Sequence, residues 1–139
     1  MAVAENKAVV GSFVEVINQG RLERLNDLVT PDFVELDPLP GQQQGREGLK
    51  QVIAAFRTAF PDIRWVIEEM VGEGDKVFSR FTWSGTHRDE FFGVPATGRR
   101  ITVKGMVIDS VVEGKMVDSR ILMDGLGMMT QLGVIPARD

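Results

Sequence analysis

One stretch decides the fold: RRITVKGMVIDSVVEGKMVDSRILM, which spans residues 99–123. Its apolar side chains recur at every second residue on both sides of the dipeptide Glu113-Gly114, and β-branched residues are frequent. Period-two alternation is typical of strands, and a glycine-containing dipeptide between two such runs is typical of a tight turn. The stretch therefore predicts two antiparallel strands joined by a hairpin.

Two further strand candidates come before this hairpin. They are IRWVIEEMV at 63–71 and KVFSRFTWSGTH at 76–87, with a turn at 72–75 between them. The link RDEFFGVPATG, residues 88–98, is longer and holds two adjacent phenylalanines, Phe91 and Phe92. Because long connections are often functional, we expect this pair at the mouth of a pocket or at a subunit interface. The four candidates together predict an antiparallel meander.

Helical periodicity dominates the first half of the chain. Residues 4–19 and 45–60 carry apolar side chains at helical spacing, and a shorter helix is predicted over 22–29. Residues 32–44, DFVELDPLPGQQQ, predict a loop with a brief strand at 33–36. Helices followed by a meander predict an α+β fold: a single domain over residues 1–139, with N-terminal helices packed on a curved mixed or antiparallel sheet that forms a cone with one internal pocket.

Composition excludes several classes of function. The net charge of -4 and the pI of about 5.1 argue against nucleic acid as a partner. The chain has no cysteine, which excludes disulfides, and one histidine, which excludes a multi-histidine metal site. No run approaches the roughly 20 apolar residues that cross a bilayer. Glu5 and Lys7 interrupt the apolar N-terminal residues, so we expect a cytoplasmic protein without a membrane partner.

Asp124 is the polar residue whose role the sequence does not decide. It follows the strand candidate at 115–123 and precedes GLGMMTQLG, so its neighbours are mostly apolar. The carboxylate has three possible roles: an N-cap of a short helix, the partner of Arg120 in an ion pair, or an acid–base group in an apolar pocket that raises its pKa.

Side-chain alternation sorts the candidates onto faces of the sheet. Asp124 has the same parity as Arg120 and Leu122, whereas His87 shares its parity with Phe81. Alternation alone does not decide which face is the inner one. From the apolar neighbours we expect Asp124 and Leu122 on the inner face, and we expect the aromatic row of residues 81 and 83 to pack against the helix stripe that includes residues 56 and 60.

Three motifs, in this order, resemble the SnoaL-like polyketide cyclases: GREGLKQVIAAFRTAFPD, GTHRDEFFGVPATGRRI, and Asp124 followed by GLGMMTQLG. This family, also called ester cyclases, belongs to the nuclear-transport-factor-like α+β cones. The resemblance covers residues 6–134 and implies intramolecular aldol condensation on an aromatic polyketide ester, without metal or cofactor, with Asp124 at the position of the family's acid–base aspartate. Members often carry FVDHDP where this chain has FVELDP, and often His-Trp or a similar pair where it has Ser119-Arg120. The loss of both implies a changed substrate or a lost cyclase activity.

We therefore predict a cofactor-independent cyclase, isomerase or related lyase that acts on an apolar cyclic or polyketide-like molecule. Asp124, assisted by His87 and Arg120, is the predicted catalytic group. The alternative is a non-catalytic small-molecule-binding module of the same fold, in which Arg120 and Asp124 form a structural pair. The predicted substrate contacts are the apolar and aromatic side chains Phe13, Leu36, Phe56, Phe60, Phe81, Trp83, Met106 and Leu122.

Apolar residues on both faces of the predicted sheet point to an assembly. The parity of Val103, Val107 and Ile121 is opposite to that of their neighbours at 106, 108 and 122, so these residues cannot all face one interior. Monomers rarely expose an apolar surface of that extent. We predict a homodimer through the sheet face.

Overall fold

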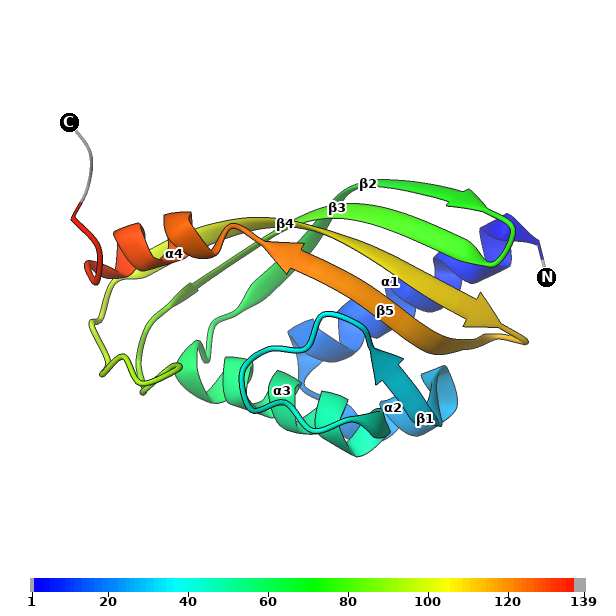
Figure 1. Cartoon of the computed structure of the whole chain (residues 1–139), viewed down its shortest axis with the longest axis horizontal. Coiled ribbons are helices and arrows are strands. Elements are labelled where there is room, and N and C mark those ends of the chain that lie inside the picture. The colour runs from blue at the N-terminus through cyan, green and yellow to red at the C-terminus, as the bar shows by residue number, and fades with distance from the viewer. Residues whose placement is uncertain (1, 137–139) are drawn as a thin grey trace.

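A computed structural model describes residues 2–136 of the chain (Figure 1). The two long predicted helices are confirmed as α1 (Val3–Gln19) and α3 (Gly45–Ala59). Helix α1 ends at Gly20, whose backbone has a positive φ of 74°, a conformation that glycine adopts without steric cost. Helix α3 ends at Ala59, shortly before Pro61, which cannot continue a helix.

Five strands form one mixed sheet. They are β1 (Val29–Glu35), β2 (Arg64–Glu73), β3 (Lys76–Thr86), β4 (Arg100–Val112) and β5 (Lys115–Met123), in the spatial order β1-β5-β4-β3-β2. The meander from β2 to β5 is antiparallel, as predicted. Glu113 and Gly114 both have positive φ, which matches the right-handed twist of a tight hairpin. The α+β fold class is confirmed.

The short elements differ from the prediction for residues 22–29. This segment divides into a 3₁₀ turn, η1 (Leu22–Arg24), and one helical turn, α2 (Leu25–Leu28). Strand β1 then begins at Val29, earlier than the predicted strand, because it pairs in parallel with β5 from Val29 opposite Met116 to Glu35 opposite Ser119. This pairing joins segments far apart in the chain, so local periodicity carried no signal for it.

The helices α1 and α3 cover the concave face of the curved sheet, and α4 (Gly125–Leu132) extends from one end of it (Figure 1). The ring of Trp83 packs edge-on against Phe56 and Phe60, with centroids 5.4 and 5.0 Å apart. The predicted packing of the aromatic row on the helix stripe is therefore confirmed. Within the described residues no helix is both long enough and apolar enough to cross a membrane.

The inner face of β5 is the opposite of the predicted one. Ser119 is buried, and Ile121 and Met123 are partly buried, whereas Arg120 is exposed and Leu122 is 72% exposed. The prediction that Leu122 and Asp124 face inward is wrong. The cause is that α1 and α3 cover the face that carries Ile121 and Met123, whereas Leu122 and its pairing partner Met106 lie on the uncovered face.

Candidate active site

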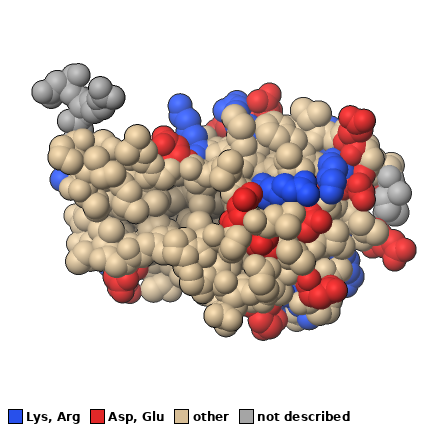
Figure 2. All heavy atoms as spheres, in the orientation of Figure 1, with Lys and Arg blue, Asp and Glu red and all other residues tan. Residues whose placement is uncertain are grey.

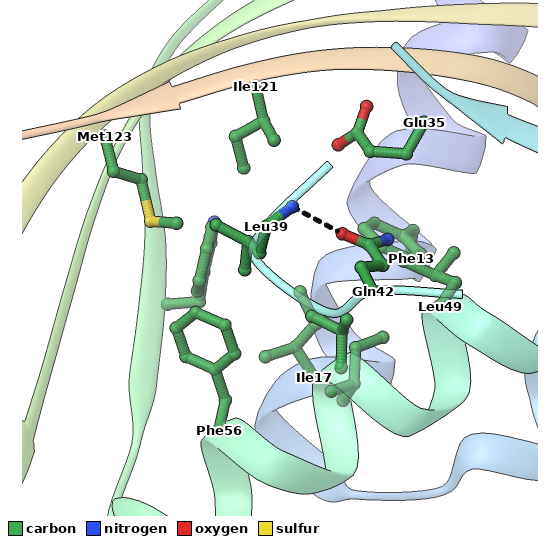
Figure 3. A pocket seen from close by; sticks show the side chains of 12 residues that line it. Phe13, Ile17, Glu35, Leu39, Gln42, Leu49, Phe56, Ile121 and Met123 are labelled. Atoms are coloured by element: carbon green, nitrogen blue, oxygen red, sulfur yellow. Dashed lines mark hydrogen bonds between the residues drawn. The ribbon is translucent and has the colours of Figure 1, made fainter. Parts of the chain in front are cut away.

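An internal pocket lies between the concave face of the sheet and the helices α1 and α3. Its outer lobe is closed by the loop of residues 36–44, and Figure 3 shows the side chains that enclose it. Ile121 and Met123 reach into it from the sheet, and Ile17 and Phe56 from the helices. Almost all of the lining is apolar; the polar side chains are Glu35 and Gln42.

A deep lobe continues inward from the outer one. The two lobes share five lining residues, namely Phe13, Glu35, Leu49, Trp65 and Ile121. Each lobe has a cavity volume of about 70 Å³, so the deep lobe is as large as the outer one. Unlike the outer lobe it contains a group of polar side chains: Glu35, Ser79, Asp109 and Ser119.

Glu35 is the last residue of β1 and lies at the junction of the two lobes. Its side chain is 8% exposed and points into the pocket opposite Ile121 (Figure 3). Burial raises the pKa of Glu35 to about 7; the charge of Asp109 also raises it, while hydrogen bonds from the backbone of Asp37 and Leu36 oppose the shift. A carboxyl group with that pKa accepts and releases protons near neutral pH, as a general acid–base group must.

The loop after β1 holds the backbone of Glu35 in place. Gln44 bonds both backbone groups of Glu35: its Oε1 accepts from the Glu35 N–H at 3.2 Å, and its Nε2 donates to the Glu35 carbonyl at 3.3 Å. The Leu36 N–H donates to the Ser119 carbonyl at 2.9 Å. These contacts fix the direction in which the Glu35 side chain leaves the strand.

Asp109 is the second carboxyl group of the pocket. It lies on the inner face of β4 and is 3% exposed. Burial raises its pKa to about 7, a hydrogen bond with Ser119 lowers it, and the charge of Asp118 raises it. Ser119 of β5 pairs with Glu35 on one side and with Asp109 on the other, so the three residues form one row across adjacent strands. The strands β1 and β4 flank β5, so the two backbones lie two strand spacings of about 4.8 Å apart, and both side chains line the deep lobe.

The mouth of the pocket lies beside the loop of residues 36–44. A hollow next to the outer lobe runs along Leu36 to Leu39 and the start of α4. Figure 2 shows that charged side chains gather over one half of this face, whereas the half that carries α4 is mostly uncharged. A second hollow, on the other side of the loop, is lined by Phe91 and Phe92, so both rings lie beside the pocket but line neither lobe. Their expected place at the mouth or at a subunit interface stays a prediction.

Asp124 does not reach the pocket. It is exposed, and its Oδ1 accepts a hydrogen bond from the Gly127 N–H at 2.8 Å, which makes it the N-cap of α4. Of the three roles that the sequence left open, the structure places Asp124 in the first, the helix cap. Its expected position inside an apolar pocket is wrong, because the chain turns into α4 at this residue and the inner parity of β5 ends at Met123.

His87 and Arg120, the predicted assistants of Asp124, also lie away from the pocket. His87 is fully buried, its ring stacks on Phe60 at a centroid distance of 5.4 Å, and its Nδ1 accepts from the Thr97 N–H at 3.2 Å. These contacts anchor the link between β3 and β4. Arg120 is exposed on the outer face of β5 and forms no ion pair with Asp124 in the described structure.

The predicted substrate contacts divide into three groups. Those that line the pocket are Phe13 and Phe56 in the outer lobe and Phe13 and Phe81 in the deep lobe. Phe60 and Trp83 are fully buried core residues that line neither lobe. Leu36 and Leu122, 45% and 72% exposed, border the hollow at the mouth and line neither lobe. Met106 is on the outer face and lines none of these cavities, so the expected pocket contact is wrong for Met106.

Sequence reasoning missed the two carboxyl groups that do line the pocket. For Asp109 a signal was present, since it interrupts a run of inward positions that otherwise carries valine, isoleucine and glycine. Glu35 follows Phe33 at strand parity in FVELDP, but the segment was predicted to be mostly loop.

Within residues 2–136 no three His, Asp or Glu side chains are grouped so that they could hold a metal ion.

Comparison with known proteins assigns this architecture to a family. The chain matches the SnoaL-like polyketide cyclase family over residues 7–132. It is 27% identical over 122 residues to the nogalonic acid methyl ester cyclase of Streptomyces nogalater, an alignment that covers 86% of this chain and 91% of that one. It is 28% identical over 131 residues to an aklanonic acid methyl ester cyclase of Streptomyces peucetius, with 90% of this chain and 88% of that one covered.

A solved structure shows the same fold. TsrD from Streptomyces laurentii superposes with a TM-score of 0.89 and 28% sequence identity, over 97% of this chain and 99% of that one. The family match spans most of the chain, and the curved sheet with an internal pocket is the architecture that the motifs implied. The chain belongs to the SnoaL-like polyketide cyclase family.

Proposed function

We propose that this protein is a cyclase that closes a ring by acid–base chemistry, with Glu35 as the group that moves the proton. The observation that carries the proposal is the Glu35 carboxyl group, which is buried at the junction of two apolar lobes and has a pKa of about 7. The cyclase activity named for the relatives from Streptomyces supports it.

The reaction would be an intramolecular aldol addition. The ionised Glu35 removes a proton from a carbon next to a carbonyl group, which leaves an enolate. The enolate carbon attacks a second carbonyl carbon of the same molecule, so that one C–C bond forms, and the proton returns to the new alkoxide oxygen. Substrate and product are isomers, so the step requires no co-reactant. Apolar walls serve this chemistry because they keep the pKa of Glu35 close to neutral pH.

The pocket favours an uncharged substrate. None of the described residues that line either lobe is Lys, Arg or His, so a carboxylate placed inside would meet two carboxyl groups and no cation. Burying an unpaired charge is strongly unfavourable. A methyl ester removes that charge, and methyl esters are the compounds for which the relatives are named.

The direct test is turnover of polyketide methyl esters, such as nogalonic or aklanonic acid methyl ester, followed by absorbance and mass spectrometry. We expect an isomeric cyclised product from the ester and at least about 10-fold slower turnover of the free acid, because the acid carries its charge into an apolar pocket lined by no Lys, Arg or His. Binding of the esters without any product, across a panel of chain lengths, would contradict the proposal and favour a small-molecule-binding module.

We also propose that two copies associate through the outer face of the sheet. Met106, Ile108 and Leu122 are 54%, 37% and 72% exposed on adjacent strands, and apolar patches of this kind are typical of interfaces. Sedimentation equilibrium at micromolar concentration is expected to give a dimer, and Leu122→Lys a monomer. Val134→Lys, at an exposed position outside the sheet, is the matched control and should remain dimeric.

The cytoplasmic location stays a prediction.

A further inference from the structure

The polar end of the deep lobe is not explained by proton transfer at Glu35 alone. Four polar side chains converge there in a pocket that is otherwise apolar. Glu35 opens onto both lobes, whereas Ser79, Asp109 and Ser119 line the deep lobe and not the outer one. Burying a polar cluster costs free energy unless its hydrogen bonds are made. Its presence at the end of a cavity therefore points to a bound group that makes those hydrogen bonds.

Ser79 is the most informative member of this cluster. It lies on the inner face of β3, is 1% exposed, and lines the deep lobe. Its Oγ has no hydrogen-bond partner among the described residues. Buried hydroxyl groups in native structures are almost always hydrogen-bonded, so a hydroxyl that is unpartnered and borders a cavity is a ready donor or acceptor for a bound molecule.

Asp109 lies near Ser79 in the same lobe. The pairing of β3 with β4 sets Ser79 opposite Val107, two positions from Asp109 on the same face. Ser119 lies opposite Asp109 in the pairing of β5 with β4, and both side chains line the deep lobe. A protonated carboxyl group in such a place donates a hydrogen bond, as a hydroxyl group does.

We propose that Ser79 and Asp109 form a subsite that holds a neutral carbonyl or hydroxyl group of the substrate at the deep end of the pocket. The subsite deepens the proposed cyclase function and rests on it for its biological role. It would place one oxygen of the substrate at a fixed depth and so select which carbon lies beside Glu35. Selection of this kind depends on hydrogen bonds that an analogue without the oxygen cannot make.

Binding of a matched pair of probes tests the subsite without any turnover. The probes are 1-tetralone, a neutral bicyclic ketone, and tetralin, the corresponding hydrocarbon, each titrated by calorimetry. One net hydrogen bond corresponds to about a 3- to 10-fold preference for the ketone in the wild-type protein. Ser79→Ala is expected to abolish that preference by weakening the binding of 1-tetralone while leaving tetralin unchanged.

The matched control is Ser84→Ala, the same substitution on the same strand at a position of opposite parity, outside the pocket. It should retain the full preference. Asp109→Asn keeps an N–H donor and should retain most of the preference, whereas Asp109→Leu should lose it. Equal affinity of the wild-type protein for the two probes, binding of neither, or a ketone preference that survives in Ser79→Ala would overturn the subsite. Because no product is measured, these outcomes are independent of whether Glu35 supports turnover.

Discussion

Glu35→Gln is expected to lower kcat for cyclisation by about 10²- to 10⁴-fold, the usual contribution of a general acid–base group. Glutamine has nearly the same shape and volume but cannot take up a proton. The affinity for the ester should stay within a few-fold of wild type, because the lobe around Glu35 is formed mainly by apolar side chains. In the wild-type enzyme, kcat/KM should rise with pH and level off above about 7, as Glu35 ionises.

Asp124→Asn is the control that shows whether Glu35 or Asp124 is the acid–base group. Asparagine retains an oxygen that accepts from the Gly127 N–H, so α4 keeps its cap and turnover should remain close to wild type. The family resemblance implied that Asp124 is the acid–base aspartate, whereas the pocket geometry points to Glu35, so the two variants should give opposite results under these two assignments. Loss of turnover in Asp124→Asn together with its retention in Glu35→Gln would remove Glu35 from the reaction.

The stability of the fold is expected to fall as pH rises from about 4.5 to about 7, opposite to the trend of most proteins. Glu35 and Asp109 ionise near pH 4.5 and 3.8 in an unfolded chain and near 7 in the folded one. Between these values the folded state binds more protons than the unfolded state, so the free energy of unfolding decreases with pH and levels off above about 7. At 1.36 kcal/mol per pKa unit the loss is at most roughly 3 kcal/mol for Glu35 and roughly 4 kcal/mol for Asp109, and less than the sum for both, since their ionisations are coupled.

Urea unfolding at pH 5, 6, 7 and 8 measures this directly. Asp109→Asn and Glu35→Gln should be more stable than wild type at pH 8 and close to it at pH 5, because the amide resembles the protonated acid. Asp62 acts in the other direction: hydrogen bonds from Thr86 hold its pKa below 3.8, so its stabilising effect is lost only in stronger acid, outside this range. A free energy of unfolding that stays flat between pH 5 and 8 would show that the two pocket carboxyl groups are solvated.

Much of the fold could be read from local pattern. Period-two alternation predicted β2, β3, β4 and β5, and the turn at Glu113-Gly114 joined the last two as expected. Helical periodicity predicted α1 and α3 with their ends at Gly20 and before Pro61. These features depend on side-chain spacing and on the backbone preferences of glycine and proline, and both are properties of short segments. The family resemblance rests on motifs of the same local kind.

The site was decided by tertiary structure. Alternation assigns residues to two faces but is symmetric between them, so the inward position of Ile121 and the outward position of Leu122 were fixed only when the helices covered one side. Likewise Glu35 and Asp109 became neighbours because β1 pairs in parallel with β5, which sets both carboxyl groups beside Ser119. Neither choice follows from the composition of any one segment. Burial beneath the helices α1 and α3 then gave both carboxyl groups the raised pKa on which the proposed chemistry depends.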